Sequence, residues 1–335
     1  MDCWKIAAVL TLAAGIGAGG GAGAQTYGPQ LEGFAYPHPI QRFELNSQGQ
    51  DLSMAFLDVP PAARSNGRTV VLLHGKNFCA ATWEATIAVL TRAGYRVIAP
   101  DQVGFCASAK PEGYQFSFDQ LAANTHALLR SRGVERAVIV GHSMGGMLAA
   151  RYALSYPAST EKLVLVNPIG LEDWRAKGVP YATIDQLFEG ERKTTFDSIK
   201  AYQQRYYYNG AWKAEYDRWV TMLAGMYAGP GGRIVAWNQA QTSDMVFTQP
   251  VVHEFGNLQV PTLLLIGGKD RTAPGANRAP KEIAERLGNY PELGRLAART
   301  IPRAKLVEFP ELGHSPQVEA PDRFHAALLK GLADG

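Results

Sequence analysis

The sequence predicts an α/β protein whose mostly parallel sheet of eight strands is flanked by helices and interrupted by one helical insertion. Short β-branched runs alternate with helix-length amphipathic segments, as a parallel sheet requires. About 90 residues without such runs separate two predicted strands, 163–166 and 261–266. Hydrophobic residues make up 46% of the 335 positions, which is enough to bury the core of such a sheet.

The predicted elements follow one another in a regular order. Two strands, 40–45 and 52–59, flank a turn and predict an N-terminal hairpin. The later strands are expected at 70–73, 96–99, 137–140, 163–166, 261–266 and 305–309. The helices between them are expected at 82–93, 118–131, 144–156 and 278–298. The insertion carries aromatic and methionine residues at helical spacing, so we interpret it as a helical cap.

The order of the predicted elements divides the chain into three parts. We expect a signal peptide at 1–24, a core at 25–170 and 258–335, and a cap insertion at 171–257. In the leader, Lys5 precedes an apolar stretch and small residues that continue to Ala24, a pattern typical of secretory signals. The apolar stretch is too short and too rich in glycine for a stable membrane span. We therefore expect a secreted or periplasmic protein that is cleaved near Ala24 and has no stable membrane insertion afterwards.

Charge and composition exclude several function classes. The formal net charge is only +3, and lysines and arginines are scattered along the chain, so a nucleic-acid partner is not expected. No group of histidines, cysteines and carboxylates has the spacing of metal ligands. The sequence therefore predicts neither a metal site nor a cofactor.

A candidate nucleophile lies in the motif Gly141-His142-Ser143-Met144-Gly145, between the predicted strand 137–140 and the predicted helix 144–156. Such a sharp strand-to-helix turn holds the serine in a strained conformation, and larger residues at the two glycine positions would collide. The pattern alone recurs by chance, but its place between strand and helix is the one that the chemistry requires. We therefore predict Ser143 as a nucleophile at the carboxyl edge of the sheet.

A second motif, His74-Gly75-Lys76, directly follows the predicted strand 70–73. With the serine motif, it resembles the α/β-hydrolase superfamily over essentially the whole mature chain. The resemblance implies that the backbone N–H groups of Lys76 and Met144 form an oxyanion hole for the negative oxygen of an attacked carbonyl, with Asn77 as an alternative donor. His74 and His142 are expected to be structural, and the side chain of Lys76 is expected to be solvated.

A serine hydroxyl is a weak nucleophile, so a histidine must take its proton and a carboxylate must orient that histidine. The loop 311–316 follows the last predicted strand and resembles the Gly-His loop of the superfamily, which implies His314 as the base.

The loop 267–274 resembles the superfamily loop that presents the acid, which implies Asp270. A competing position lies after the strand that ends at Val166, where Asn167 stands and Glu172 and Asp173 follow. Asp270 would also suit a helix N-cap or a turn.

The predicted activity is hydrolysis of a carboxylic ester, lactone or thioester in a small-molecule acyl substrate. Serine at the elbow argues against the haloalkane dehalogenases and epoxide hydrolases that resemble this fold, which have aspartate there. Two alternatives use the same triad: a carbon–carbon bond hydrolase, and a prolyl-type aminopeptidase with Glu189, Glu191 or Glu215 holding the amine of the substrate. A non-enzymatic alternative is a binding protein on an inactive hydrolase scaffold.

The loop 100–108 departs from the superfamily pattern, because Cys106 stands where glycine is usual. Asp101 is expected to brace this loop. Cys79 and Cys106 are the only cysteines of the predicted mature chain. In the strand order of the superfamily, the strands before these cysteines are neighbours, so the resemblance implies a disulfide between Cys79 and Cys106 beside the oxyanion loop. The alternative is a pair of buried free thiols, because spacing alone does not establish how far apart the two Cα atoms lie.

Overall fold

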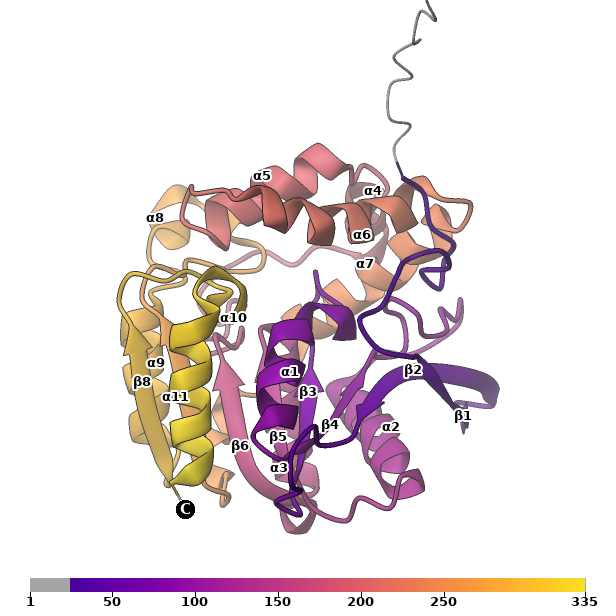
Figure 1. Ribbon diagram of the computed structural model, residues 1–335. Helices are drawn as coiled ribbons and strands as arrows, with labels where there is room; N and C mark the ends of the chain where they lie inside the picture. Colours follow the sequence, from indigo (N-terminus) through magenta and orange to yellow (C-terminus); the bar gives the residue numbers. More distant parts are fainter. Residues whose placement is uncertain (1–24, 335) are drawn as a thin grey trace, which may run out of the picture.

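A single eight-stranded sheet forms the centre of the molecule in the computed structural model, which describes residues 25–334 (Figure 1). The strand order is β1-β2-β4-β3-β5-β6-β7-β8. β1 (Gln41–Ser47) pairs antiparallel with β2 (Gln50–Val59), and β2 pairs antiparallel with β4 (Arg96–Pro100). All other neighbours pair in parallel, so the predicted mostly parallel sheet is confirmed. The predicted signal peptide, 1–24, lies outside the described residues.

The remaining strands form the buried centre and one edge of the sheet. They are β3 (Thr69–Leu73), β5 (Ala137–His142), β6 (Thr160–Val166), β7 (Thr262–Gly267) and β8 (Ala304–Phe309). Every residue of β5 and β7 is buried, as expected for strands that are covered on both faces. Because the register pairs Leu73 with Gly141 and His142 with Val166, the loops that follow these strands begin at the same edge.

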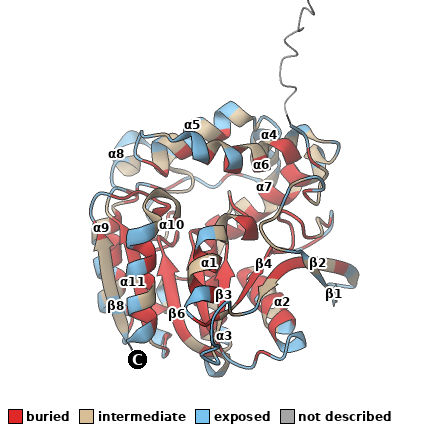
Figure 2. Ribbon diagram, viewed as in Figure 1, coloured by how far each residue is buried: buried red, intermediate tan, exposed pale blue. Residues whose placement is uncertain are grey.

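Helices cover both faces of the sheet (Figure 2). The sheet therefore separates the apolar core into two layers, one on each face. α1 (Glu84–Arg92) and α11 (Pro321–Ala333) pack on one face. α2 (Phe118–Ser131), α3 (Met144–Ser155) and α9 (Tyr290–Thr300) pack on the other. The central strands β3 and β6 are red in Figure 2, whereas the edge strand β8 is mostly tan. The solvent-facing sides of α1, α2 and α11 carry pale blue, which matches the amphipathic spacing in the sequence.

The segment between β6 and β7 is helical, and its helices lie across the arrowhead end of the sheet (Figure 1). They are α4 (Ile184–Glu191), α5 (Phe196–Tyr206), α6 (Asp217–Ala228) and α7 (Gly232–Thr248). Capping boxes at Thr183 and Thr195 begin α4 and α5. This cap therefore covers the edge at which the loops after the parallel strands meet. No helix within residues 25–334 is long and apolar enough to cross a membrane.

The predicted helix 278–298 is wrong, because two shorter helices occupy this stretch. α8 (Lys281–Ala284) is followed by a turn, and α9 begins only at Tyr290. Gly288 in the turn has φ +67°, and a Cβ there would lie 2.8 Å from the carbonyl oxygen of Arg271. A turn with this conformation and this close approach favours glycine, and Pro291 lies in the first turn of the helix that follows.

Candidate active site

Ser143 occupies a sharp turn between β5 and α3 and has φ 56° and ψ −122°. Positive φ at a non-glycine residue stores backbone strain that the surrounding structure must maintain. A Cβ at Gly141 would lie 2.0 Å from the carbonyl oxygen of Gly145, and one at Gly145 would lie 2.3 Å from that of Leu73. Both glycines of the motif are thus required by close contacts, as the sequence predicts. The N–H of Ser143 donates to the carbonyl of Val166 at 3.1 Å.

His314 and Asp270 form a fully buried pair on the loops after β8 and β7. The Nδ1 atom of His314 lies 2.6 Å from Oδ2 of Asp270, and neither side chain is exposed. The carboxylate also accepts bonds from the N–H of Thr272 at 2.8 Å and from Nδ2 of Asn167 at 2.9 Å. Because Nδ1 of His314 donates to the carboxylate, its Nε2 carries the lone pair of a neutral imidazole and can accept a proton.

The nucleophile turn and the histidine loop are in direct contact. His142, directly before Ser143, donates from Nε2 to the carbonyl oxygen of His314 at 2.8 Å, and the centroids of the two rings lie 4.9 Å apart. Burial holds the pKa of His142 well below its usual value, so this residue is neutral and structural, as predicted. Within residues 25–334, Nε2 of His314 is buried without a hydrogen-bond partner. The structure thus places Ser143, His314 and Asp270 at one edge of the sheet and leaves the basic nitrogen free.

The competing acids do not contact the histidine. Glu172 accepts from the N–H of Gly288 and pairs with Lys177, while Asp173 pairs with His253. At the competing edge position, Asn167 is fully buried and bonds to Asp270.

Asn167 has a role at the site that the sequence does not predict. Its Oδ1 accepts from the N–H of Gly267 at 2.9 Å, so its side chain connects the end of β7 to the carboxylate of Asp270. The available signal was an amide at the position where some superfamily members have the acid.

The loop after β3 lies against the nucleophile. A Cβ at Gly75 would be 2.9 Å from Cβ of Ser143. Within the described chain, the backbone N–H groups of Lys76 and Met144 have no hydrogen-bond acceptor, which leaves both available to a ligand. His74 donates from Nδ1 to the carbonyl of Gly75 at 2.9 Å and accepts the N–H of Gln102 at Nε2, and burial lowers its pKa. It is structural, as predicted.

The expectation of a solvated Lys76 side chain is wrong. Its Nζ lies 2.8 Å from Oε1 of Glu191, the last residue of α4, and both side chains are about four-fifths buried. The other oxygen of Glu191 accepts the hydroxyl of Tyr227 at 2.6 Å. The neighbouring Asn77 donates to the hydroxyl of Tyr207 at 3.0 Å. Two adjacent residues of this loop are thus held by side chains of the cap.

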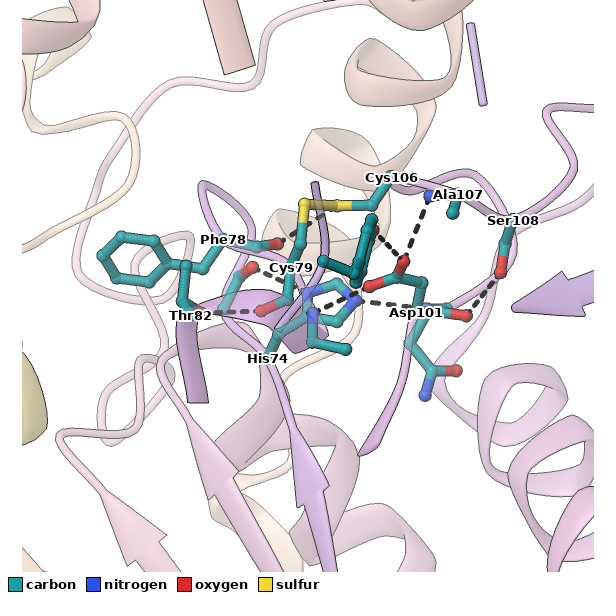
Figure 3. Close-up of a disulfide and its surroundings, with 12 residues drawn as sticks. His74, Phe78, Cys79, Thr82, Asp101, Cys106, Ala107 and Ser108 are labelled. Carbon is teal, nitrogen blue, oxygen red and sulfur yellow. Dashed lines mark hydrogen bonds between the residues drawn. A yellow bond between two sulfur atoms is a disulfide. The ribbon is translucent and has the colours of Figure 1, made fainter. Parts of the chain in front are cut away.

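Cys79 and Cys106 form a disulfide beside this loop, as the sequence analysis expects (Figure 3). Their Cα atoms lie 5.8 Å apart, within the usual range. Asp101 accepts the N–H of Ala80 at 2.7 Å and that of Ala107 at 3.1 Å, so it braces both sides of the bridge, as predicted. The two sulfur atoms lie near the carboxylate of Asp101, but because they are bonded to each other they are not thiolate ligands for a metal.

A cavity of about 930 Å³ lies between the cap and the core. Lys76 and Asn77 line it on the core side, while Ser143 and His314 do not line it. Most of its wall is apolar and comes from the cap. The cap residues concerned include Leu187, Ile199, Tyr202, Leu223, Met226 and Tyr227. The cavity therefore reaches the loop with the free N–H of Lys76 and can hold an apolar group of considerable size.

Comparison with known proteins gives consistent matches. A family model described as "Alpha/beta hydrolase family" matches residues 70–327. The structure of a probable hydrolytic enzyme from Pseudomonas aeruginosa PAO1 is 62% identical, covers 92% of this chain and 99% of its own, and superposes with a TM-score of 0.91. A 2-hydroxy-6-oxononadienedioate/2-hydroxy-6-oxononatrienedioate hydrolase of Comamonas testosteroni is 27% identical over 80% of this chain and 89% of its own. An esterase of Exiguobacterium antarcticum, 19% identical with a TM-score of 0.67 over 87% of this chain and 98% of its own, shares the fold.

Proposed function

The chain belongs to the α/β-hydrolase family, and on that premise we propose that it is a serine hydrolase that cleaves a carboxylic ester, lactone or thioester through an acyl-enzyme on Ser143. The observation that carries the proposal is the buried His314–Asp270 pair on the loop that contacts the strained serine turn. Nε2 of this histidine has no hydrogen-bond partner within residues 25–334. This is the arrangement that a base needs in order to take a proton from a serine hydroxyl.

In the proposed mechanism, Oγ of Ser143 attacks the acyl carbonyl carbon while its proton passes to Nε2 of His314. Asp270 keeps the Nδ1 proton in place and stabilises the imidazolium that forms. The negative oxygen of the tetrahedral intermediate accepts the N–H groups of Lys76 and Met144, and one such donor contributes about 3 kcal/mol. The C–O or C–S bond then breaks and the leaving group takes the proton from His314. A water molecule, activated by the same base, hydrolyses the acyl-enzyme and regenerates Ser143.

Two features support a secreted or periplasmic location for the proposed enzyme. The first is the signal-like leader, 1–24. The second is the Cys79–Cys106 disulfide, since such bonds form and persist in oxidising compartments. The proposed partner is a small-molecule acyl substrate, which the largely apolar cavity would accommodate.

A carbon–carbon bond hydrolase is the second candidate, because a relative that is 27% identical bears the name of such an activity. A prolyl-type aminopeptidase has less support. Glu189 and Glu215 pair with Arg192 and Lys213 at the surface, and Glu191, which lines the cavity, is already paired with Lys76.

The test combines active-site labelling with turnover. The purified wild-type protein should react with a fluorophosphonate probe at Ser143 and hydrolyse p-nitrophenyl esters. Ser143→Ala should abolish labelling. Asp270→Asn should lower kcat by about 10⁴-fold, and His314→Ala should lower it by about 10⁶-fold. Ser131→Ala, at a surface serine on α2, serves as the matched control and should retain full activity. Failure of the wild type to label at Ser143 would favour the binding-protein alternative. Labelling with carbon–carbon cleavage but no ester hydrolysis would favour the second candidate.

A further inference from the structure

One residue of the cap, Tyr207, touches both loops on which the proposed chemistry depends. It directly follows α5 and is only 3% exposed. Its backbone carbonyl accepts the N–H of His314 at 2.9 Å. A Cβ at the preceding Gly313 would lie 2.1 Å from the same carbonyl oxygen, so the close approach of cap and histidine loop requires glycine there.

The ring of Tyr207 also packs against the imidazole of His314. The ring centroids lie 4.5 Å apart and the planes are inclined by 35°. His142 contacts the same imidazole at 4.9 Å, and Asp270 bonds to its Nδ1. The imidazole is thus confined by its hydrogen bond to Asp270 and by the rings of Tyr207 and His142. An aromatic face at this distance also stabilises positive charge, which develops on His314 when it takes a proton.

The hydroxyl of Tyr207 reaches the other loop. It accepts a hydrogen bond from Nδ2 of Asn77 at 3.0 Å. The ring lies 5.8 Å from that of Phe78, the next residue. Asn77 follows Lys76, whose N–H is the proposed oxyanion donor, so the hydroxyl of Tyr207 holds the side chain of the residue directly after that donor.

From these contacts we propose that Tyr207 is a positioning residue, which holds the imidazole of His314 against Asp270 and fixes the oxyanion loop through Asn77. This inference rests on the proposed function. It means that the cap, in addition to enclosing a cavity, sets the geometry of both the base and the oxyanion donors. A change at Tyr207 should therefore act on kcat, whereas a change in the cavity wall should act on KM and on substrate preference.

The chain offers a matched control in Tyr208. It is the next residue, is 1% exposed, and packs within the cap against the ring of Tyr216 at 4.0 Å. Its hydroxyl is buried without a partner in the part of the chain that the structure describes. Its side chain has the same size and nearly the same burial as that of Tyr207, but within residues 25–334 its ring pairs only with cap aromatics, Tyr207, Trp212 and Tyr216. A general destabilisation of the cap should therefore affect both positions alike.

The experiment compares Tyr207→Phe, Tyr207→Leu, Tyr208→Phe, Tyr208→Leu and Asn77→Ala. It measures kcat and KM for a p-nitrophenyl ester, the second-order rate of fluorophosphonate labelling, and the urea midpoint of unfolding. Tyr207→Phe loses only the bond to Asn77 and should lower kcat about 10-fold with KM changed less than about 2-fold. Tyr207→Leu also loses the aromatic face and should lower kcat about 100-fold. Combining Tyr207→Phe with Asn77→Ala should lower kcat no further than the more severe single change, because both remove one interaction.

Several results would overturn the inference. One such result is a folded Tyr207→Phe variant that labels Ser143 as fast as the wild type. Another is a loss of kcat in Tyr208→Leu equal to that in Tyr207→Leu, at an equal loss of stability. Additive losses in the double variant would rule out action through Asn77. If the wild type neither labels nor turns over, the proposed function itself fails, and the inference falls with it. Normal wild-type labelling with unaffected Tyr207 variants would refute the inference alone.

Discussion

Removing the disulfide should lower the free energy of unfolding, and the size of the loss depends on the number of residues between the two cysteines. The cysteines are 27 positions apart, and closing a loop of this length contributes about 3.5 kcal/mol in the chain-entropy model. The described chain, 25–334, has an unfolding entropy of about 0.65 kcal/mol/K at typical values per residue. The double variant Cys79→Ala/Cys106→Ala should therefore have a Tm about 5 °C below that of the wild type.

Scanning calorimetry of the purified, non-reduced protein measures this shift. Wild-type protein that has been refolded under reducing conditions is the control, because it keeps both sulfur atoms and lacks only the bond. It should show nearly the same lowered Tm as the double variant. A fall of less than about 2 °C in both samples would refute the reasoning that the bond acts by restricting the unfolded chain. Alkylation of both cysteines in unreduced protein, detected by intact mass, would show that the bond does not form.

Three further predictions concern residues around the site and in the core. Asn167→Ala removes a hydrogen-bond partner of Asp270 and leaves the N–H of Gly267 without its acceptor. The kcat should fall about 10-fold, and the free energy of unfolding in urea should fall by about 2 kcal/mol. If both values are unchanged, Asn167 does not brace the acid. Glu191→Gln leaves the largely buried ammonium of Lys76 without a charged partner, so the free energy of unfolding should fall by about 1 kcal/mol. The double variant Lys76→Met/Glu191→Gln should recover part of this loss, and a double variant that is additively worse would contradict the pairing. Burial lowers the pKa of His325 from its usual 6.5 to about 4. As the pH falls, this histidine therefore takes up a proton in the unfolded chain before it does so in the folded protein. The free energy of unfolding should fall by about 2–3 kcal/mol between pH 6.5 and pH 4. Urea unfolding across this range should show a smaller slope in His325→Gln, and equal slopes would disprove the assignment.

The sequence by itself determined the features that depend on neighbouring residues. The alternation of β-branched and amphipathic runs predicts the strands and most of the helices. A strand that is buried on both faces needs a continuous apolar run, and a helix that is buried on one face needs apolar residues every three to four positions. The elbow is also local, since the two glycines and Ser143 lie within five residues of one strand-to-helix turn. Asp270, His314 and the cysteine pair depended on the resemblance of their loops to a known superfamily. Gly288 and Pro291, which break the predicted helix 278–298, were visible in the sequence but were outweighed there by the amphipathic pattern.

Only the tertiary structure decided which distant side chains meet at the site. Asn167 bonds to Asp270 across 103 positions, and Asn77 bonds to Tyr207 across 130. The pairing of Lys76 with Glu191 spans 115 positions and replaces the solvated side chain that the sequence predicts. None of these residues has a local pattern that distinguishes it, because a hydrogen bond depends on where two backbones come to lie. That placement is set by the parallel register of the sheet and by the packing of the cap over its carboxyl edge, and both result from the whole chain folding together.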